Sequence, residues 1–191
     1  MSEIDLPIIA FKSSKEWASW LAQNHTKSSG LWLRLFKKGS GVASVTYAEA
    51  LDEALCYGWI DGQLDKYDEK SWLRKFTPRR PKSVWSKKNI AHIDRLTRAG
   101  KMKSAGRKEV EAAKADGRWK RAYDSPSAKQ IPADFLKALS QDKKAKAFFA
   151  TLNKANTYAI AWRLQTAKRP ETRAKRLQAI LAKLKKGEKF H

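Results

Sequence analysis

The segment from residue 72 to residue 89, WLRKFTPRRPKSVWSKKN, limits the fold of this chain more than any other segment. Its first part is aromatic and typical of a strand, and its last part opens at Ser86 as a capped basic helix. Between them, Pro78 and Pro81 fix the backbone on either side of Arg79 and Arg80. The chain therefore leaves a sheet, holds two arginines in a rigid turn and enters a helix within one short stretch.

The charge of the chain changes at the same place. Residues 1–69 hold 7 Lys/Arg and 10 Asp/Glu, whereas residues 70–191 hold 34 and 9, so the two net charges are −3 and +25. With a sequence pI of about 10.2, the chain favours polyanionic partners such as nucleic acid, anionic lipid or acidic protein.

The remaining pattern predicts the α+β class, with a small, mainly antiparallel sheet packed with helices and a C-terminal helical module after it. Capping boxes predict helices that open at Ser13 and Thr46. The predicted strands are 7–11, 31–36, 59–67 and 71–77. Further helices are predicted to open near residues 86, 104, 132, 142, 153 or 156, and 170.

Composition predicts three parts along the chain. Residues 1–120 form an α+β core domain that contains the Arg-Arg motif, residues 121–131 form a polar linker, and residues 132–191 form a basic helical module. The chain is long enough to bury a real core in such an arrangement.

Several classes of protein are not indicated. No apolar run reaches 18 residues, so no membrane span is predicted, and the first residues do not resemble a secretory signal. The three histidines and the single cysteine, Cys56, lack metal-ligand spacing, and no nucleotide or nucleophile motif occurs. We therefore expect no metal and no cofactor, a cytoplasmic location, and no catalytic residue of recognisable type.

The Arg-rich segment is the main candidate site, because arginine forks and the unpaired N–H groups at a helix N-terminus both suit an anion. A bound phosphate or carboxylate is one interpretation. An internal clamp of Arg79 and Arg80 by Asp61, Asp65, Asp68 or Glu69 is equally compatible with the sequence. Trp59 and Trp72 are expected in the core, and this expectation is weaker for Trp85. The candidate ligands are Arg74, Arg79, Arg80, Lys82, Trp85, Ser86, Lys87 and Asn89.

Two further groups are secondary candidates. Asp61 could act as a base beside the arginines, although Asp61-Gly62 is more typical of a turn. Cations also follow helical spacing opposite a leucine stripe near the C-terminus. This pattern indicates either a solvated helix face or a surface that attracts polyanions. The cations taken as candidates are Lys168, Arg169, Arg173 and Arg176.

Two stretches resemble a known family. Residues 53–62 (EALCYGWIDG) with 74–89, and residues 161–176, which include AW and AKRPETRAKR, are similar to the YdeI/OmpD-associated family over about residues 14–187. Residues 164–166 (LQT) depart from the family pattern. The resemblance implies a bacterial protein of the cytoplasm with a role in bacteriocin protection or stress tolerance, and it implies no catalytic residue.

Three functions follow as hypotheses. The first is a non-enzymatic protein that binds a small anionic ligand or partner at the Arg-rich strand-to-helix turn. The second is a nucleic-acid-binding protein that uses the net positive charge of residues 70–191. The third is an enzyme that acts on a phosphorylated or carboxylated small molecule, with Asp61 as its base.

Overall fold

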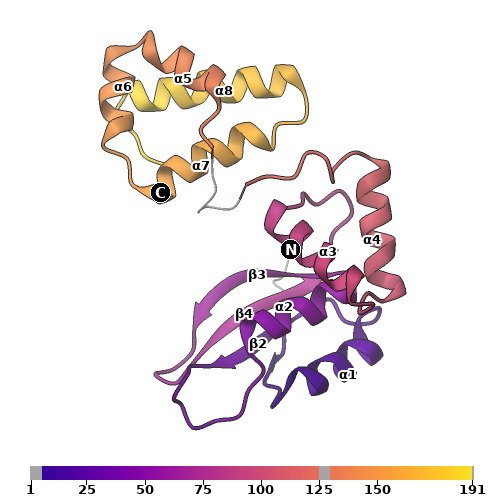
Figure 1. The fold of residues 1–191 in the computed structure, drawn as a ribbon. Coiled ribbons are helices and arrows are strands. Elements are labelled where there is room, and N and C mark those ends of the chain that lie inside the picture. The colour runs from indigo at the N-terminus through magenta and orange to yellow at the C-terminus, as the bar shows by residue number, and fades with distance from the viewer. Residues whose placement is uncertain (1–5, 125–129, 191) are drawn as a thin grey trace. The chain divides into compact units, whose positions relative to one another are not determined.

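The computed structural model describes residues 6–124 and 130–190. The chain divides into two compact units. Unit 1 consists of Met1–Ser83 with Ala91–Asp116, and unit 2 consists of Val84–Ile90 with Gly117–His191. Figure 1 shows the sheet and helices of unit 1 and the helices of unit 2. The sequence predicts boundaries between its three parts after residues 120 and 131. The two observed units instead divide after Asp116, and residues 84–90 belong to unit 2.

Unit 1 is built on a four-stranded mixed sheet. The strands are β1 (Ile8–Ile9), β2 (Leu31–Phe36), β3 (Trp59–Lys66) and β4 (Ser71–Pro78), in the order β1-β2-β4-β3. The pair β1–β2 is parallel, and β4 pairs antiparallel with both β2 and β3. A bulge lies between Asp61 and Leu64 of β3. The α+β class and the mainly antiparallel sheet are thus confirmed.

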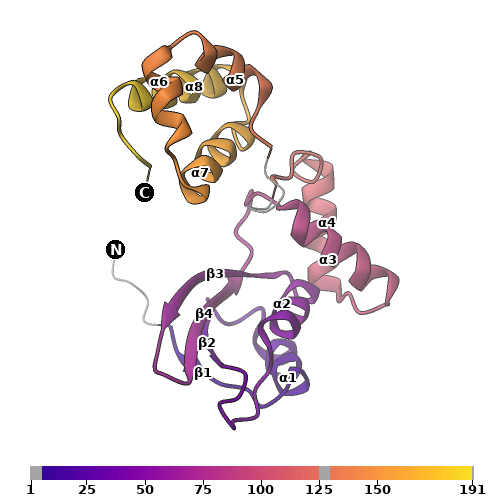
Figure 2. The same cartoon turned by 60° about the vertical axis from the view of Figure 1, so that its left-hand side comes forward.

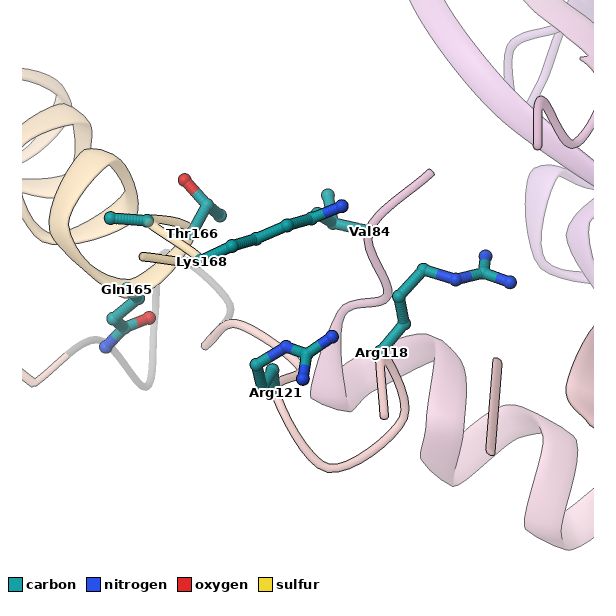
Figure 3. Close-up of a pocket in the computed structure, with 7 residues that line it drawn as sticks. Val84, Arg118, Arg121, Gln165, Thr166 and Lys168 are labelled. Carbon is teal, nitrogen blue, oxygen red and sulfur yellow. The ribbon is translucent and has the colours of Figure 1, made fainter. Parts of the chain in front are cut away.

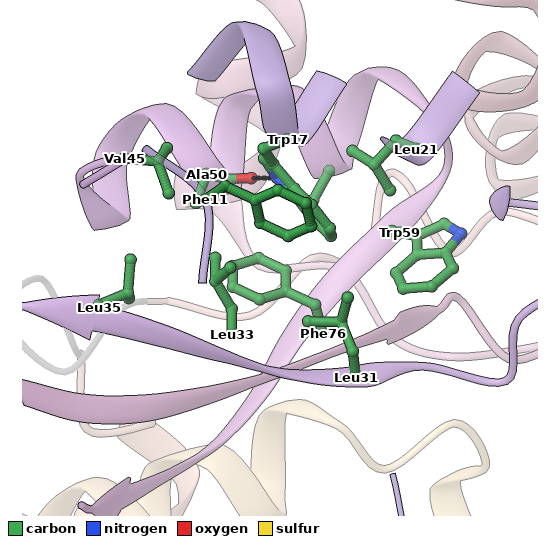
Figure 4. Packing of buried hydrophobic residues seen from close by; sticks show 11 residues of the cluster. Phe11, Trp17, Leu21, Leu31, Leu33, Leu35, Val45, Ala50, Trp59 and Phe76 are labelled. Carbon is green, nitrogen blue, oxygen red and sulfur yellow. Dashed lines mark hydrogen bonds between the residues drawn. The ribbon is translucent and has the colours of Figure 1, made fainter. Parts of the chain in front are cut away.

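Helices α1 (Ser14–Asn24) and α2 (Tyr47–Cys56) lie on one face of this sheet, as Figure 2 shows. The side chains of Leu31, Leu33 and Leu35 alternate along β2 and point into the core between sheet and helices (Figure 4). Trp17 is fully buried there, and its indole N–H donates to the Ala50 carbonyl oxygen over 3.0 Å. The Thr46 capping box is present as predicted.

Two more helices complete unit 1. They are α3 (Lys87–Arg98) and α4 (Ser104–Ala115), which follow the strand-to-helix turn. The first residues of α3, up to Ile90, belong to unit 2. Asp52 of α2 accepts hydrogen bonds from Arg95 at 2.6 and 2.7 Å. Helix α4 approaches the end of α2 so closely that a Cβ on Gly106 would lie 2.3 Å from the Cys56 carbonyl oxygen. Only glycine fits at this contact.

Unit 2 contains four further helices: α5 (Ala133–Ser140), α6 (Lys143–Ala150), α7 (Lys154–Gln165) and α8 (Pro170–Lys185). Their apolar faces meet in one core that holds Phe135, Ile160 and Leu184. A second contact joins the start of α3 to the segment after α4. There the Trp85 ring packs 5.1 Å from the Trp119 ring, and Ser86 bridges to Tyr123. The predicted C-terminal helices are therefore observed.

One local prediction was wrong. Asp61-Gly62 is not a turn but part of β3, where the bulge provides the irregularity that the dipeptide suggested. Within the described ranges, no helix is both long and apolar enough to cross a membrane.

Candidate anion-binding site

Arg74 and Asp61, both candidates from the sequence, lie together on unit 1. The Arg74 Nε donates to Asp61 Oδ2 over 3.0 Å, and its terminal nitrogen also contacts that oxygen. The Tyr47 hydroxyl donates to the same oxygen over 2.7 Å. Three donors thus converge on one carboxylate oxygen, and only 12% of the Asp61 side chain is exposed. These bonds commit Asp61 Oδ2 to Arg74 and Tyr47.

The turn after β4 holds three other candidate cations, Arg79, Arg80 and Lys82. Arg79 is buried, with 7% of its surface exposed, and its backbone N–H donates to the Gly58 carbonyl oxygen. Arg80 and Lys82 are exposed. The Ser83 backbone N–H donates to the Arg80 carbonyl oxygen, and Lys82 has a φ of 64°. Pro81 is the second residue of this turn, and Lys82, with its positive φ, is the third. This is the pattern of a type II turn, whose third position favours glycine.

The start of α3 lies in unit 2. Ser86 accepts the Asn89 backbone N–H, and the Lys87 backbone N–H donates to the Tyr123 carbonyl oxygen. Lys87 Nζ lies 2.7 Å from Asp124 Oδ1. Trp85 is buried at 1% exposure. The side chain of Lys87, the first residue of α3, thus already holds the Asp124 carboxylate, and this hydrogen bond is the chief cause that lowers the pKa of Asp124.

The four acids that the sequence offered as internal clamps have different environments. Asp61 binds Arg74, and Asp68 binds Arg34 over 2.6 Å. The exposed Asp65 accepts the backbone N–H of Lys66. The backbone carbonyl of Glu69 accepts a bond from Lys37. The sequence offered these acids as clamps of Arg79 and Arg80, whereas the clamp that Asp61 forms is on Arg74.

Two of the C-terminal cations hold α8 to its neighbours. Arg173 forms a paired contact with Asp134 and donates to the Leu164 carbonyl oxygen over 2.6 Å. Arg176 donates to the Arg163 carbonyl oxygen over 2.7 Å. Both arginines thus satisfy carbonyl groups at the end of α7, which a helix C-terminus leaves without intrahelical partners. Lys168 and Arg169 lie between α7 and α8 and are exposed.

Lys168 belongs to a cationic hollow of unit 2 that the sequence did not indicate. Figure 3 shows Lys168 reaching toward Val84 and the Arg121 side chain on the same side, whereas the guanidinium of Arg118 points away from both. The residues that line the hollow include three cations, one hydroxyl and no carboxylate. They are Val84, Arg118, Arg121, Gln165, Thr166, Ala167 and Lys168.

Local structure explains how the cationic hollow forms. Helix α4 ends at Ala115, and Gly117 takes the left-handed conformation, with a φ of 75°, that ends many helices. A Cβ at Gly117 would lie 2.8 Å from a terminal nitrogen of Arg121, so the glycine makes room for that guanidinium. Gln165 is fixed by Asp124, whose carboxylate accepts its amide over 2.7 Å. These contacts set Arg121 and the end of α7 around one small space.

The sequence missed Arg118 and Arg121 because they stand at the edge of a segment that looks like a linker. Arg118 was part of a stretch marked only by its polar composition, although it is 6% exposed in the structure. The aromatic residues Trp119 and Tyr123, which pack on Trp85 and Trp162, are the sequence signal that this stretch is folded. Among the described residues, no three His, Cys, Asp or Glu side chains gather closely enough to hold a metal ion.

The comparison with protein families gives two matches. Residues 9–109, more than half of the chain, match the family described as a domain of unknown function (DUF8412). The chain belongs to this family. Residues 129–187 match the family described as Bacteriocin-protection, YdeI or OmpD-Associated. Neither the curated proteins nor the solved structures give a match.

The YdeI/OmpD-associated resemblance is thus confirmed, but for the C-terminal module alone. Residues 53–89, which carried most of the resemblance in the sequence, fall within the other match. The YdeI/OmpD-associated match includes α5 to α8 and ends at residue 187. It contains Gln165, Thr166 and Lys168, which form one side of the cationic hollow.

Proposed function

We propose that this protein is a non-enzymatic, anion-binding protein of the bacterial cytoplasm and that it acts in bacteriocin protection or stress tolerance. The anion binds in the cationic hollow of unit 2. The observation that carries this proposal is the lining of that hollow, which combines Arg118, Arg121 and Lys168 with no carboxylate. The two exposed cations of this lining, Arg121 and Lys168, form an environment that favours negative charge.

The size of the cationic hollow restricts what enters it. Its interior offers about 10 Å³, which is the room of one water-sized group. A whole small molecule does not fit, but one oxygen of a phosphate or carboxylate does. The rest of such a group lies at the mouth, beside the exposed Arg121 and Lys168. The ligand is therefore an anion with a protruding, compact charged group, and phosphate has this shape.

The overall charge of unit 2 supports the same proposal. Unit 2 holds 21 Lys/Arg and 5 Asp/Glu, a net charge of +16, whereas unit 1 holds 20 and 14, a net charge of +6. Such an excess attracts anions over distances of about 10 Å at ordinary ionic strength. The same excess favours nucleic acid as the second candidate ligand, because phosphate backbones are bound mainly through Lys and Arg.

Calorimetric titration with inorganic pyrophosphate tests the proposal. The wild type is compared with the double variant Arg121→Ala/Lys168→Ala and with the control Lys137→Ala/Lys144→Ala, which removes two exposed cations of unit 2 outside the cationic hollow. We expect the first variant to bind at least about tenfold more weakly, because hydrogen bonds to charged groups contribute about 1.5–3 kcal/mol each. Equal weakening in both variants would mean diffuse attraction without a site.

The link to bacteriocin protection is supported by the family that the C-terminal module matches. Survival of bacterial cells under bacteriocin challenge tests it, with the wild type or the Arg121→Ala/Lys168→Ala variant expressed at equal level. We expect the wild type to raise survival and the variant to lose that gain. Full protection by the variant would separate the physiological role from the cationic hollow.

A further inference from the structure

A second hollow of unit 2 lies between α7 and α8 and differs from the first in size and lining. Its volume is about 330 Å³, within the range of small-ligand sites. Its lining combines two aromatic rings, three cations and two aliphatic side chains, again without a carboxylate. The residues are Trp162, Arg163, Arg176, Ala179, Ile180, Lys183 and Phe190. We call it the aromatic hollow.

The rings of the aromatic hollow are held in place. Trp162 is 37% exposed, which is unusual for so large an apolar side chain, and the Tyr123 ring meets it edge-on at 6.2 Å and 82°. The Phe190 backbone N–H donates over 2.8 Å to the Asn156 side chain, which is itself 1% exposed. The C-terminal segment is thereby fixed against α7. The aromatic hollow presents these rings without first having to order them, which lowers the entropic cost of binding.

The cations of the aromatic hollow are anchored as well. Arg163 stacks 4.6 Å from the centre of the Phe190 ring and donates one bond to the Ala159 carbonyl oxygen. Lys183 lies 5.4 Å from the same ring centre. Arg163 and Arg176 each donate these bonds through one terminal nitrogen, and a guanidinium has further N–H donors to offer an anion.

The two hollows meet at one contact. Arg176, which lines the aromatic hollow, donates over 3.3 Å to the hydroxyl of Thr166, which lines the cationic hollow. Unit 2 therefore places a site for a compact anionic group next to a larger site for a flat ring. Alternation of a charged group with a flat ring is the chemistry of a nucleotide chain.

We propose that unit 2 binds single-stranded nucleic acid, with one base stacked on Trp162 in the aromatic hollow and a neighbouring phosphate in the cationic hollow. This inference rests on the proposed anion binding and names its ligand. A single strand is required, because the bases of a duplex are stacked inside it and cannot enter a hollow. Stacking on an aromatic side chain accepts any base, so we expect little sequence preference.

The test compares two labelled oligomers of equal length and charge, one of thymidine nucleotides and one of abasic deoxyribose phosphates, by fluorescence anisotropy with the full chain. The proteins are the wild type, Trp162→Ala, and the control Leu136→Ala, which removes another exposed apolar side chain of unit 2. We expect the wild type to prefer the thymidine oligomer by about 5- to 150-fold, the range that stacking of one base on an aromatic side chain gives. Trp162→Ala should lose that preference, and Trp162→Phe should restore most of it.

The possible outcomes separate the two proposals. If the wild type binds both oligomers equally, base stacking is refuted, whereas the proposed anion binding survives. If the wild type binds neither oligomer nor pyrophosphate, both proposals fail. If Trp162→Ala and Leu136→Ala lose the preference equally, the effect is one of packing, and the aromatic hollow is not the site. A circular dichroism spectrum of each variant confirms that unit 2 remains folded.

Discussion

Unit 1 and unit 2 differ in how many acids they offer to their cations. In unit 1, three aspartates each hold an arginine: Asp61 holds Arg74, Asp68 holds Arg34, and Asp52 holds Arg95. Unit 2 has only 5 acids for 21 cations, so at most a quarter of its cations can be paired one to one. The first pattern stabilises a fold, and the second is the excess of positive charge on which the proposed anion binding rests. We therefore place the proposed binding in unit 2, although the most conspicuous arginines of the sequence lie in unit 1.

The largest expected effect concerns the core of unit 1. Trp17→Ala removes a fully buried ring and the bond from its indole to Ala50, and we expect a loss of about 3–5 kcal/mol in the free energy of unfolding. Urea unfolding measures this loss. Pyrophosphate affinity, measured below the unfolding transition, should stay within about twofold of the wild type. A parallel loss of affinity would place part of the anion site in unit 1.

Arg74→Ala sharpens the comparison further, because the sequence offers Arg74 as an anion ligand and the structure pairs it with Asp61. Removing it leaves a largely buried carboxylate with fewer donors, and we expect about 1–3 kcal/mol of destabilisation with unchanged anion affinity. Arg121→Ala/Lys168→Ala should show the reverse. If Arg74→Ala weakens pyrophosphate binding without destabilising the fold, the division of roles between the units is wrong.

Tyr47 provides a test by pH. Burial and, after it, the hydrogen bond to Asp61 raise the pKa of Tyr47 to about 12. The raised pKa favours the folded state fully below about pH 10, the pKa of an unfolded tyrosine, and this contribution is lost as the pH rises through 12. Ultraviolet difference titration should show an ionisation near pH 12 that is absent in Tyr47→Phe. Ionisation of every tyrosine near pH 10 would mean that the cluster around Asp61 is open.

The smallest expected effect is at Lys82, whose positive φ suits glycine. We expect Lys82→Gly to raise the melting temperature by about 2–4 °C, the equivalent of about 1 kcal/mol for a chain of this size. The matched variant Lys82→Ala should give no such gain, because alanine keeps the strained conformation. A loss of anion affinity in both variants would return the turn after β4 to the list of candidate sites.

The sequence predicted most of the elements and little of the site. Local rules were sufficient for the Thr46 capping box, for β2, and for the helix that begins at Pro170. They failed at Asp61-Gly62, where a bulge inside a strand has the composition of a turn. A strand's register decides such a case, and register depends on the partner strand.

The cationic hollow could not be read from the sequence for a related reason. Arg121 and Lys168 are 47 positions apart, and neither lies in a motif with characteristic spacing. What joins them is tertiary structure: Gly117 ends α4, and the segment that follows packs by Trp119 on Trp85. Charge composition located the positive half of the chain correctly. Only packing could show which cations share one space.

The most direct test of the central claim is the affinity for a labelled thymidine oligomer across a salt series, measured by anisotropy for three proteins. They are the wild type, Arg121→Ala/Lys168→Ala in unit 2, and Arg80→Ala/Lys82→Ala in unit 1, whose replaced side chains are all exposed. If unit 2 holds the site, the unit 2 variant loses affinity, and its plot of log affinity against log salt is less steep by about one per phosphate contact removed. The unit 1 variant then follows the wild type. Loss of affinity in the unit 1 variant alone would contradict the account.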